Sequence, residues 1–203
     1  LGKWLKNKNR SSFYIGTKAG FNWNNKNEVG LSRKYLSSQL SKSLTNLNLD
    51  YVDFFWLHRD DNSVVLEDLC ETINGFINLN KVKYVGCSNW TLSRIAKFQE
   101  IALKNNLKGF SCIQPMWSLA KRNPINDGLN QISFDESQMN YCIENGLTVF
   151  PYCSQASGFF SGNYMNFQDR PDLPRSKYVQ ENFYSKENFE RLERVKVLSD
   201  QRK

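Results

Sequence analysis

The stretch LNLDYVDFFWLH, residues 47–58, decides the fold of this chain and ends in its only histidine. From Tyr51 to Leu57 it is a run of apolar, β-branched and aromatic residues, which predicts a strand buried on both faces, as in a parallel sheet. The run stops at His58, and charged residues follow. Because chemistry in parallel α/β folds is placed at the carboxyl ends of strands, His58 is either a catalytic side chain or a structural histidine at a strand end.

Short apolar runs alternate with helix-length amphipathic segments around this strand, which is the pattern of consecutive β/α units. The predicted strands are residues 13–17, 51–57, 82–87, 110–113 and 147–152. The predicted helices are residues 33–47, 65–80, 92–106, 134–145 and 186–199, and Ser32 and Thr91 are expected N-caps. Loops are expected over 19–30 and 117–133, and the length of the second favours a functional role. The sequence therefore predicts an α/β fold in a single domain, residues 1–203.

The charge distribution and the cysteines limit which partners and which cellular location we expect. The net charge of +7 comes from lysines and arginines that are scattered over predicted helices and are densest at the two ends. We interpret them as solvated helix faces and expect no nucleic acid partner. Five widely spaced cysteines without a Cys-x-x-Cys pair indicate a reducing, cytoplasmic location. No apolar run is long enough to cross a bilayer, so no membrane partner is expected, and the oligomeric state stays unknown.

A different polar side chain stands at the carboxyl end of each predicted strand. A lysine depresses the pKa of a neighbouring acid, a histidine orients a carbonyl, amides and hydroxyls complement a carboxamide, and a tyrosine ring stacks on a planar heterocycle. Each residue alone also has a structural interpretation, as a solvated lysine, a helix cap, a turn or a core tyrosine. Their joint placement favours a carbonyl and nicotinamide pocket, and one histidine without a carboxylate cluster predicts no metal. The set comprises Lys18, His58, Ser88, Asn89, Gln114, Tyr152, Ser154 and Gln155.

Short motifs follow one another at fixed spacing along the chain. They are Leu1-Gly2, IGTKAG at 15–20, Ser43-Leu44, DYVD at 50–53, Leu57-His58, KVKYVGCSNW at 81–90, Gln114 and Pro151-Tyr152. In this order they resemble the aldo-keto reductases, NAD(P)H-dependent oxidoreductases built on a (β/α)8 barrel, from residue 1 to about residue 162. The resemblance implies a partial (β/α)8 TIM barrel with about five consecutive β/α units.

By this resemblance, Lys18 and His58 match two members of the family's catalytic tetrad. The lysine lowers the pKa of a tyrosine general acid, and the histidine positions the carbonyl and polarises the acid. Trp56 and Trp90 are either walls of the substrate pocket or core residues. Asp53, at the start of its strand rather than its catalytic end, is expected to be structural, as is Asp50.

The resemblance also implies a cofactor site. Ser88, Asn89 and Gln114 match the groups that hold the nicotinamide carboxamide, and Tyr152 matches the ring that stacks on the nicotinamide. The loop that approaches the pyrophosphate contains Ser154, Gln155 and Gly158. The implied cofactor is NADP, with NAD as the alternative, and the implied substrate is a small-molecule carbonyl compound.

The resemblance fails at both ends of the chain. In the family, the tetrad aspartate and tyrosine precede the point where this sequence starts, and a closing strand with a phosphate-binding segment follows its end. We therefore expect a fragment of a protein that reduces an aldehyde or ketone with hydride from NAD(P)H, and we expect the 203-residue chain alone to be inactive. Two alternatives stay open. One is a catalytically inactive nicotinamide-binding or regulatory interaction protein. The other is an unrelated barrel enzyme such as a lyase or hydrolase, which the lack of paired strand-end carboxylates disfavours.

Overall fold

A computed structural model describes residues 1–21, 30–124 and 132–202, which form two compact units. The first unit contains Leu1–Gln114 and Asp135–Phe150, and the second contains Pro115–Phe134 and Pro151–Lys203. The loops predicted over 19–30 and 117–133 fall partly on residues 22–29 and 125–131, which lie outside the described residues. The single domain predicted over 1–203 stays a prediction.

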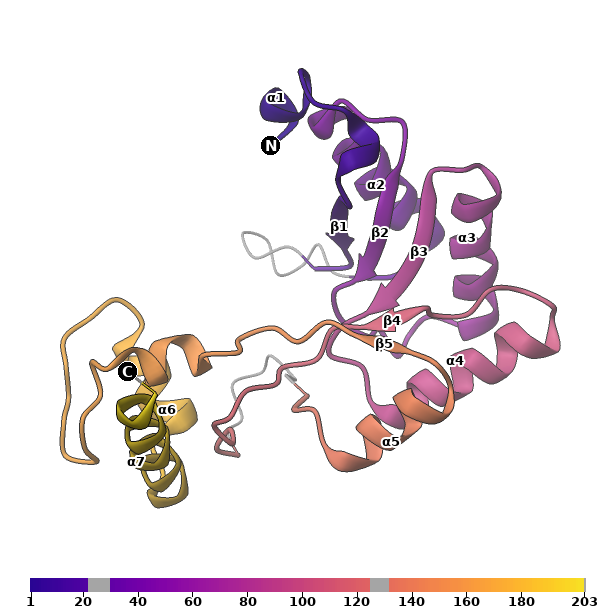
Figure 1. Ribbon diagram of the computed structural model, residues 1–203. Coiled ribbons are helices and arrows are strands. Elements are labelled where there is room, and N and C mark those ends of the chain that lie inside the picture. The colour runs from indigo at the N-terminus through magenta and orange to yellow at the C-terminus, as the bar shows by residue number, and fades with distance from the viewer. Residues whose placement is uncertain (22–29, 125–131, 203) are drawn as a thin grey trace. The chain divides into compact units, whose positions relative to one another are not determined.

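The first unit is a parallel sheet in which strands alternate with helices (Figure 1). Its five strands follow one another in the order β1-β2-β3-β4-β5, and all four pairings are parallel. This arrangement confirms the predicted α/β class and the partial (β/α)8 barrel with five consecutive strands. The elements are α1 (Gly2–Leu5), η1 (Arg10–Ser12), β1 (Gly16–Ala19), α2 (Arg33–Leu47), β2 (Val52–Leu57), α3 (Leu66–Asn78), β3 (Val82–Cys87), α4 (Leu92–Lys104), β4 (Cys112–Ile113), α5 (Glu136–Glu144) and β5 (Thr148–Val149).

Local capping explains where the helices of this unit begin and end. Ser32 and Thr91 accept hydrogen bonds from the backbone N–H groups three residues later, so both predicted N-caps of α2 and α4 are confirmed. Asn48 ends α2 in the left-handed conformation, with φ 55°, which is the usual way for a helix to stop. The second helix, predicted over 65–80, is shorter in the structure, where α3 begins at Leu66 and ends at Asn78.

The core of the first unit lies between β2 and the helices. Phe55 is fully buried and meets the ring of Phe76 on α3 edge to face, with centroids 5.9 Å apart. The opposite face of the strand carries Phe54 and Trp56, which stack on each other and contact Phe150. Strand β2 therefore has one face covered by helices and one face lined by aromatic side chains.

Four strands differ from the predicted bounds, the second only by starting at Val52 instead of Tyr51. The first begins at Gly16 because the carbonyl of Phe13 accepts a hydrogen bond from Arg10 rather than from a neighbouring strand. The fourth begins at Cys112 because the side chain of Gln99 bonds both the N–H and the carbonyl of Phe110. The fifth is reduced to Thr148–Val149, since Pro151 has no N–H to donate to a ladder.

The second unit has its own hydrophobic core. It contains η2 (Ala156–Ser161), α6 (Ser176–Phe183) and α7 (Lys186–Gln201), of which only the last was predicted. The segment 115–124 is bonded to the helices by Asn188, whose side chain accepts from the N–H of Lys121 and donates to its carbonyl at 2.8 and 2.7 Å. The core residues are Met116, Ala120, Ala156, Phe159, Tyr164, Val179, Phe183, Phe189 and Leu192.

Candidate active site

The parallel pairing brings the predicted residues of the first four strands to one edge of the sheet. Lys18 lies within β1, and the other residues follow directly after β2, β3 and β4. The ladder continues one step past each of those strands: the N–H of His58 donates to Ala19, that of Ser88 to Leu57, and that of Gln114 to Cys87, at 2.7–2.9 Å. The backbone positions of these residues are therefore set by the sheet itself.

Side-chain hydrogen bonds join three of these strand ends. The Ser88 hydroxyl donates to the carbonyl of Gln114 at 2.7 Å, and the Asn89 amide donates to the carbonyl of His58 at 3.1 Å and to the Ser88 hydroxyl at 3.2 Å. Asn89 has φ 60°, a left-handed conformation that asparagine tolerates better than most residues. Ser88 and Asn89 are both buried. A hydroxyl and two amides thus share one edge, next to the histidine.

His58 lies in an environment that opposes its protonation. Desolvation, followed by the positive charges of Lys18 and Arg59, lowers the pKa of His58 to about 4. Its ring packs edge-on against Phe21, with centroids 5.6 Å apart. At neutral pH the imidazole is therefore uncharged, so it can orient a carbonyl through a hydrogen bond, whereas it is a poor source of a full proton.

Lys18 supplies positive charge beside this histidine. Its side chain keeps solvent-exposed surface, yet partial desolvation of the ammonium lowers the pKa of Lys18 below its usual value. The strand extends to Ala19, so Lys18 projects from within β1 instead of following it. Thr17, one residue earlier, bonds Ser43 of α2 at 2.9 Å. Because side chains alternate along a strand, Lys18 points to the face opposite α2.

Two tryptophans that were candidate pocket walls take different positions. Trp90 is 2% exposed and packs against Phe98 and Phe110 with centroids 6.2 and 5.1 Å away, so it belongs to the core. Trp56 lies on the aromatic face beside Gly86, where an added Cβ would come within 2.5 Å of the indole ring. Because Gly86 has no side chain, the Trp56 ring can pack directly against its backbone.

The remaining predicted cofactor residues lie in the second unit. Tyr152 donates its N–H to the carbonyl of Pro115 at 3.0 Å and accepts from the N–H of Trp117 at 3.2 Å. Ser154 and Gln155 are exposed, and Gly158 has φ 99° within a turn that also contains left-handed residues 153, 156 and 157. The N–H groups of residues 156 and 158 donate within the turn, to the carbonyls of Cys153 and Gln155 at 2.8 and 3.0 Å.

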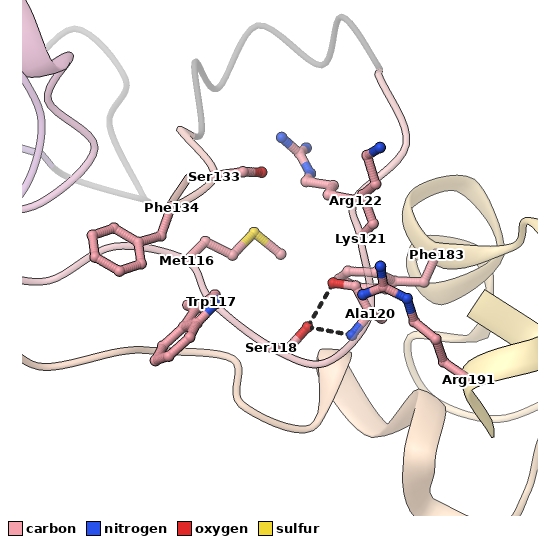
Figure 2. A pocket seen from close by; sticks show the side chains of 10 residues that line it. All are labelled: Met116, Trp117, Ser118, Ala120, Lys121, Arg122, Ser133, Phe134, Phe183 and Arg191. Atoms are coloured by element: carbon pink, nitrogen blue, oxygen red, sulfur yellow. Dashed lines mark hydrogen bonds between the residues drawn. The ribbon is translucent and has the colours of Figure 1, made fainter. Parts of the chain in front are cut away.

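Sequence reasoning missed a pocket in the second unit, whose volume is about 250 Å³. Figure 2 shows the cationic side chains of Lys121, Arg122 and Arg191 across from Met116 and Phe134. Arg122 donates to Asn182 at 2.6 Å, and Arg191 is paired with Glu187. The length of loop 117–133 was the only sequence signal for this pocket, because Arg191 comes from a helix some 70 residues later.

In the part of the chain that the structure describes, no group of three or more His, Cys, Asp or Glu side chains is arranged to hold a metal ion. In the same ranges, no helix has the length and apolar character needed to cross a membrane.

A family model described as the Aldo/keto reductase family matches residues 1–202. The chain belongs to this family. It is 33% identical over 132 residues to the aldo-keto reductase AFTS1 of Alternaria alternata, covering 65% of this chain and 33% of that protein. It is 30% identical over 158 residues to an L-glyceraldehyde 3-phosphate reductase of Escherichia coli strain K12, covering 77% of this chain and 43% of that reductase. The chain thus spans between a third and a half of these aldo-keto reductases.

Proposed function

We propose that this aldo-keto reductase chain contributes the Lys18–His58 side of the active site of an oxidoreductase that reduces an aldehyde or ketone with NAD(P)H. The observation that carries the proposal is the placement, at one edge of one sheet, of an uncharged histidine with a lysine charge beside it and an amide and hydroxyl set next to both. Membership of a family whose relatives are named reductases supports the same chemistry. NADP is the preferred cofactor and NAD the alternative.

The donor set of the first unit fits a nicotinamide carboxamide. A hydroxyl has one proton and two lone pairs, and Ser88 uses its proton on Gln114 and one lone pair on Asn89. One lone pair is left, with which Ser88 would accept a hydrogen bond from the carboxamide NH2 group. The bound cofactor supplies hydride. In the second unit, Tyr152 would stack on the nicotinamide, and Ser154, Gln155 and Gly158 would contact the pyrophosphate.

The reacting carbonyl is oriented by the neutral imidazole of His58. Lys18 places positive charge where negative charge develops on the carbonyl oxygen and lowers the pKa of a neighbouring acid. Since His58 is uncharged at neutral pH, the proton delivered to that oxygen comes from another group. In the proposed reaction this group is the family's tyrosine, which the resemblance places before Leu1. We then expect the 203-residue chain alone to turn over no carbonyl substrate.

The test is the loss of NADPH absorbance with aldehyde and ketone substrates, in protein expressed from the complete natural reading frame. We expect His58→Gln and Lys18→Met each to lower kcat by about 100-fold or more, the typical size of the loss when one group that stabilises a developing oxyanion is removed. Lys97→Met is the matched control, because Lys97 forms only an exposed pair with Glu100 on α4. It removes the same charge and should leave kcat unchanged.

Fluorescence titration with NADPH and NADH separates the proposal from its alternative. Binding without turnover of any carbonyl substrate would identify a nicotinamide-binding or regulatory protein. If the complete protein binds neither nucleotide, or if His58→Gln and Lys18→Met reduce activity no more than Lys97→Met, the proposal is wrong.

A further inference from the structure

An ion pair outside the predicted site links the two segments that carry His58 and Asn89. Asp60, two residues after His58, accepts two hydrogen bonds from the Arg94 guanidinium, Nε to Oδ2 at 2.9 Å and Nη2 to Oδ1 at 3.0 Å. The same Nη2 donates to the carbonyl of Asp61 at 3.3 Å. Both side chains are mostly buried, with 14% of Asp60 and 24% of Arg94 exposed. A bidentate pair of this kind fixes orientation as well as distance.

Arg94 is itself held in place from its own side. Its backbone N–H donates to the N-cap Thr91 at 3.3 Å, and its guanidinium lies 5.6 Å from the centroid of the buried Trp90 ring. Helix α4 therefore holds the Arg94 end of the pair. On the other side, Asp60 accepts from the N–H of Asp61 at 2.9 Å, so the fork joins two segments that are each held locally.

The pair acts together with a second tie between the same two segments. Asn89 donates to the carbonyl of His58 at 3.1 Å, and Arg94 binds Asp60 and Asp61 a few residues further along. With one attachment, the segment after β2 could rotate about that point. The second attachment restrains this rotation. Without the fork, the peptide of His58 would be held by the sheet and by Asn89 alone.

We propose that the Asp60–Arg94 fork is a positioning device that fixes His58 against Asn89, and so couples the carbonyl-orienting histidine to the carboxamide site. This inference rests on the proposed function for its catalytic meaning. The other ion pairs of these helices have no such geometry: Arg33–Glu71 is exposed and 3.5 Å long, and Lys97–Glu100 is exposed on one helix.

An NMR pH titration tests this directly, because His58 is the only histidine of the 203 residues and its imidazole signal is assigned as the one that is missing in His58→Gln. The groups that face it are Lys18 of β1, Arg59 of its own segment, the ring of Phe21, and Asn89 after β3, and Asp60 lies two residues further along the same segment. We expect the wild-type signal to titrate near pH 4, as the pKa of His58 indicates. Arg94→Lys keeps the positive charge but cannot form the bidentate pair with Asp60. The His58 ring should then be less restrained and more hydrated, and the midpoint of its titration should rise by at least one pH unit.

Two further variants keep the outcome unambiguous. Arg33→Lys makes the same replacement at the exposed pair and should leave the titration unchanged. Asp60→Asn removes a negative charge, which by Coulomb's law alone would lower the pKa of His58, whereas loss of positioning raises it. A rise in both Arg94→Lys and Asp60→Asn, with circular dichroism and thermal unfolding showing folded protein, supports the proposal. If the midpoint of the His58 titration in both variants is equal to or lower than that of the wild type, the proposal is wrong.

The titration needs neither cofactor nor turnover, so it separates this inference from the proposed function. If the complete wild-type protein is inactive while the two variants shift the His58 titration, the proposed function fails and the positioning role stands. If the protein is an active reductase, Arg94→Lys should lower kcat about tenfold and raise the Kd for NADPH, and unchanged values would show that the fork is merely structural.

Discussion

Asp53 offers the most direct test of what holds the first unit together. Its carboxylate is buried at the start of β2 and accepts hydrogen bonds from the N–H of Ile15 at 2.9 Å, from Arg10 at 2.6 Å and from Lys83 at 3.0 Å. Asp53→Asn keeps the shape and one acceptor oxygen, which can still serve Ile15. Arg10 donates to the same oxygen as Ile15, Oδ2, so its hydrogen bond can persist but loses the negative charge of its acceptor. The ion pair of Oδ1 with Lys83 is half exposed and contributes little.

A hydrogen bond to a charged group contributes about 1.5–3 kcal/mol, so we expect Asp53→Asn to cost about 2 kcal/mol. For a chain of this length that corresponds to a decrease in Tm of roughly 4–8 °C in a thermal unfolding experiment. Asp50→Asn is the matched control, since Asp50 is exposed and three residues away, and it should change stability by less than about 0.5 kcal/mol.

The pH dependence gives this prediction a second signature. Desolvation alone would raise the pKa of Asp53, but hydrogen bonds from Ile15, Arg10 and Lys83 outweigh it and lower the pKa below 3.8. The stability that a lowered carboxyl pKa contributes is present above the unfolded value and is lost as the pH falls through the folded value. The difference between wild type and Asp53→Asn should therefore shrink in acid. Equal Tm values at neutral pH, or a difference that grows in acid, would refute the assignment of Asp53 as the anchor of this strand.

Two further predictions concern the aromatic face and the histidine. Gly86→Ala would place a Cβ within 2.5 Å of Trp56 and 2.7 Å of the Cys112 sulfur, so overpacking should cost about 1–3 kcal/mol in thermal unfolding. Gly75→Ala on α3, where an added Cβ meets nothing within 4 Å, should instead stabilise by up to about 1 kcal/mol, and equal effects of the two changes would contradict the packing described here. Because folding lowers the pKa of His58 from 6.5 to about 4, the unfolded chain binds that proton first, and stability should decrease as pH falls from 6.5 to 4. Urea unfolding across this range should show the decrease in wild type and a smaller one in His58→Gln, and identical slopes would count against a desolvated His58.

The elements that the sequence predicted well are those set by local chemistry. Ser32 and Thr91 cap their helices as expected, helix 33–47 and strand 82–87 have the predicted bounds, and His58 follows its strand directly. Each of these features depends on residues that are close to it in the sequence. The alignment of strand ends also followed from the sequence, since parallel strands joined by helices share one carboxyl edge.

The differences arise where a distant side chain competes for the backbone. Gln99 takes both hydrogen-bonding groups of Phe110 and shortens β4, although it is eleven residues away. Helix α6 begins after Arg175, which has φ 75° and no capping side chain, so no local signal marks its start. Asn182 at its end is buried and bonded to Arg122, a contact across 60 residues. Such pairings cannot be read from periodicity.

The polar residues at the carboxyl edge of the sheet have a structural role that is compatible with the chemical role proposed for them. The amide of Asn89 joins His58 to Ser88, and the hydroxyl of Ser88 joins Asn89 to Gln114, so one chain of hydrogen bonds crosses three strand ends. A substitution at any member leaves a buried partner unsatisfied and shifts the next residue along the chain. The structural and catalytic interpretations that each residue allowed on its own are therefore not exclusive. The bonds that make Asn89 and Ser88 structural also fix the positions from which they would hold a carboxamide beside His58.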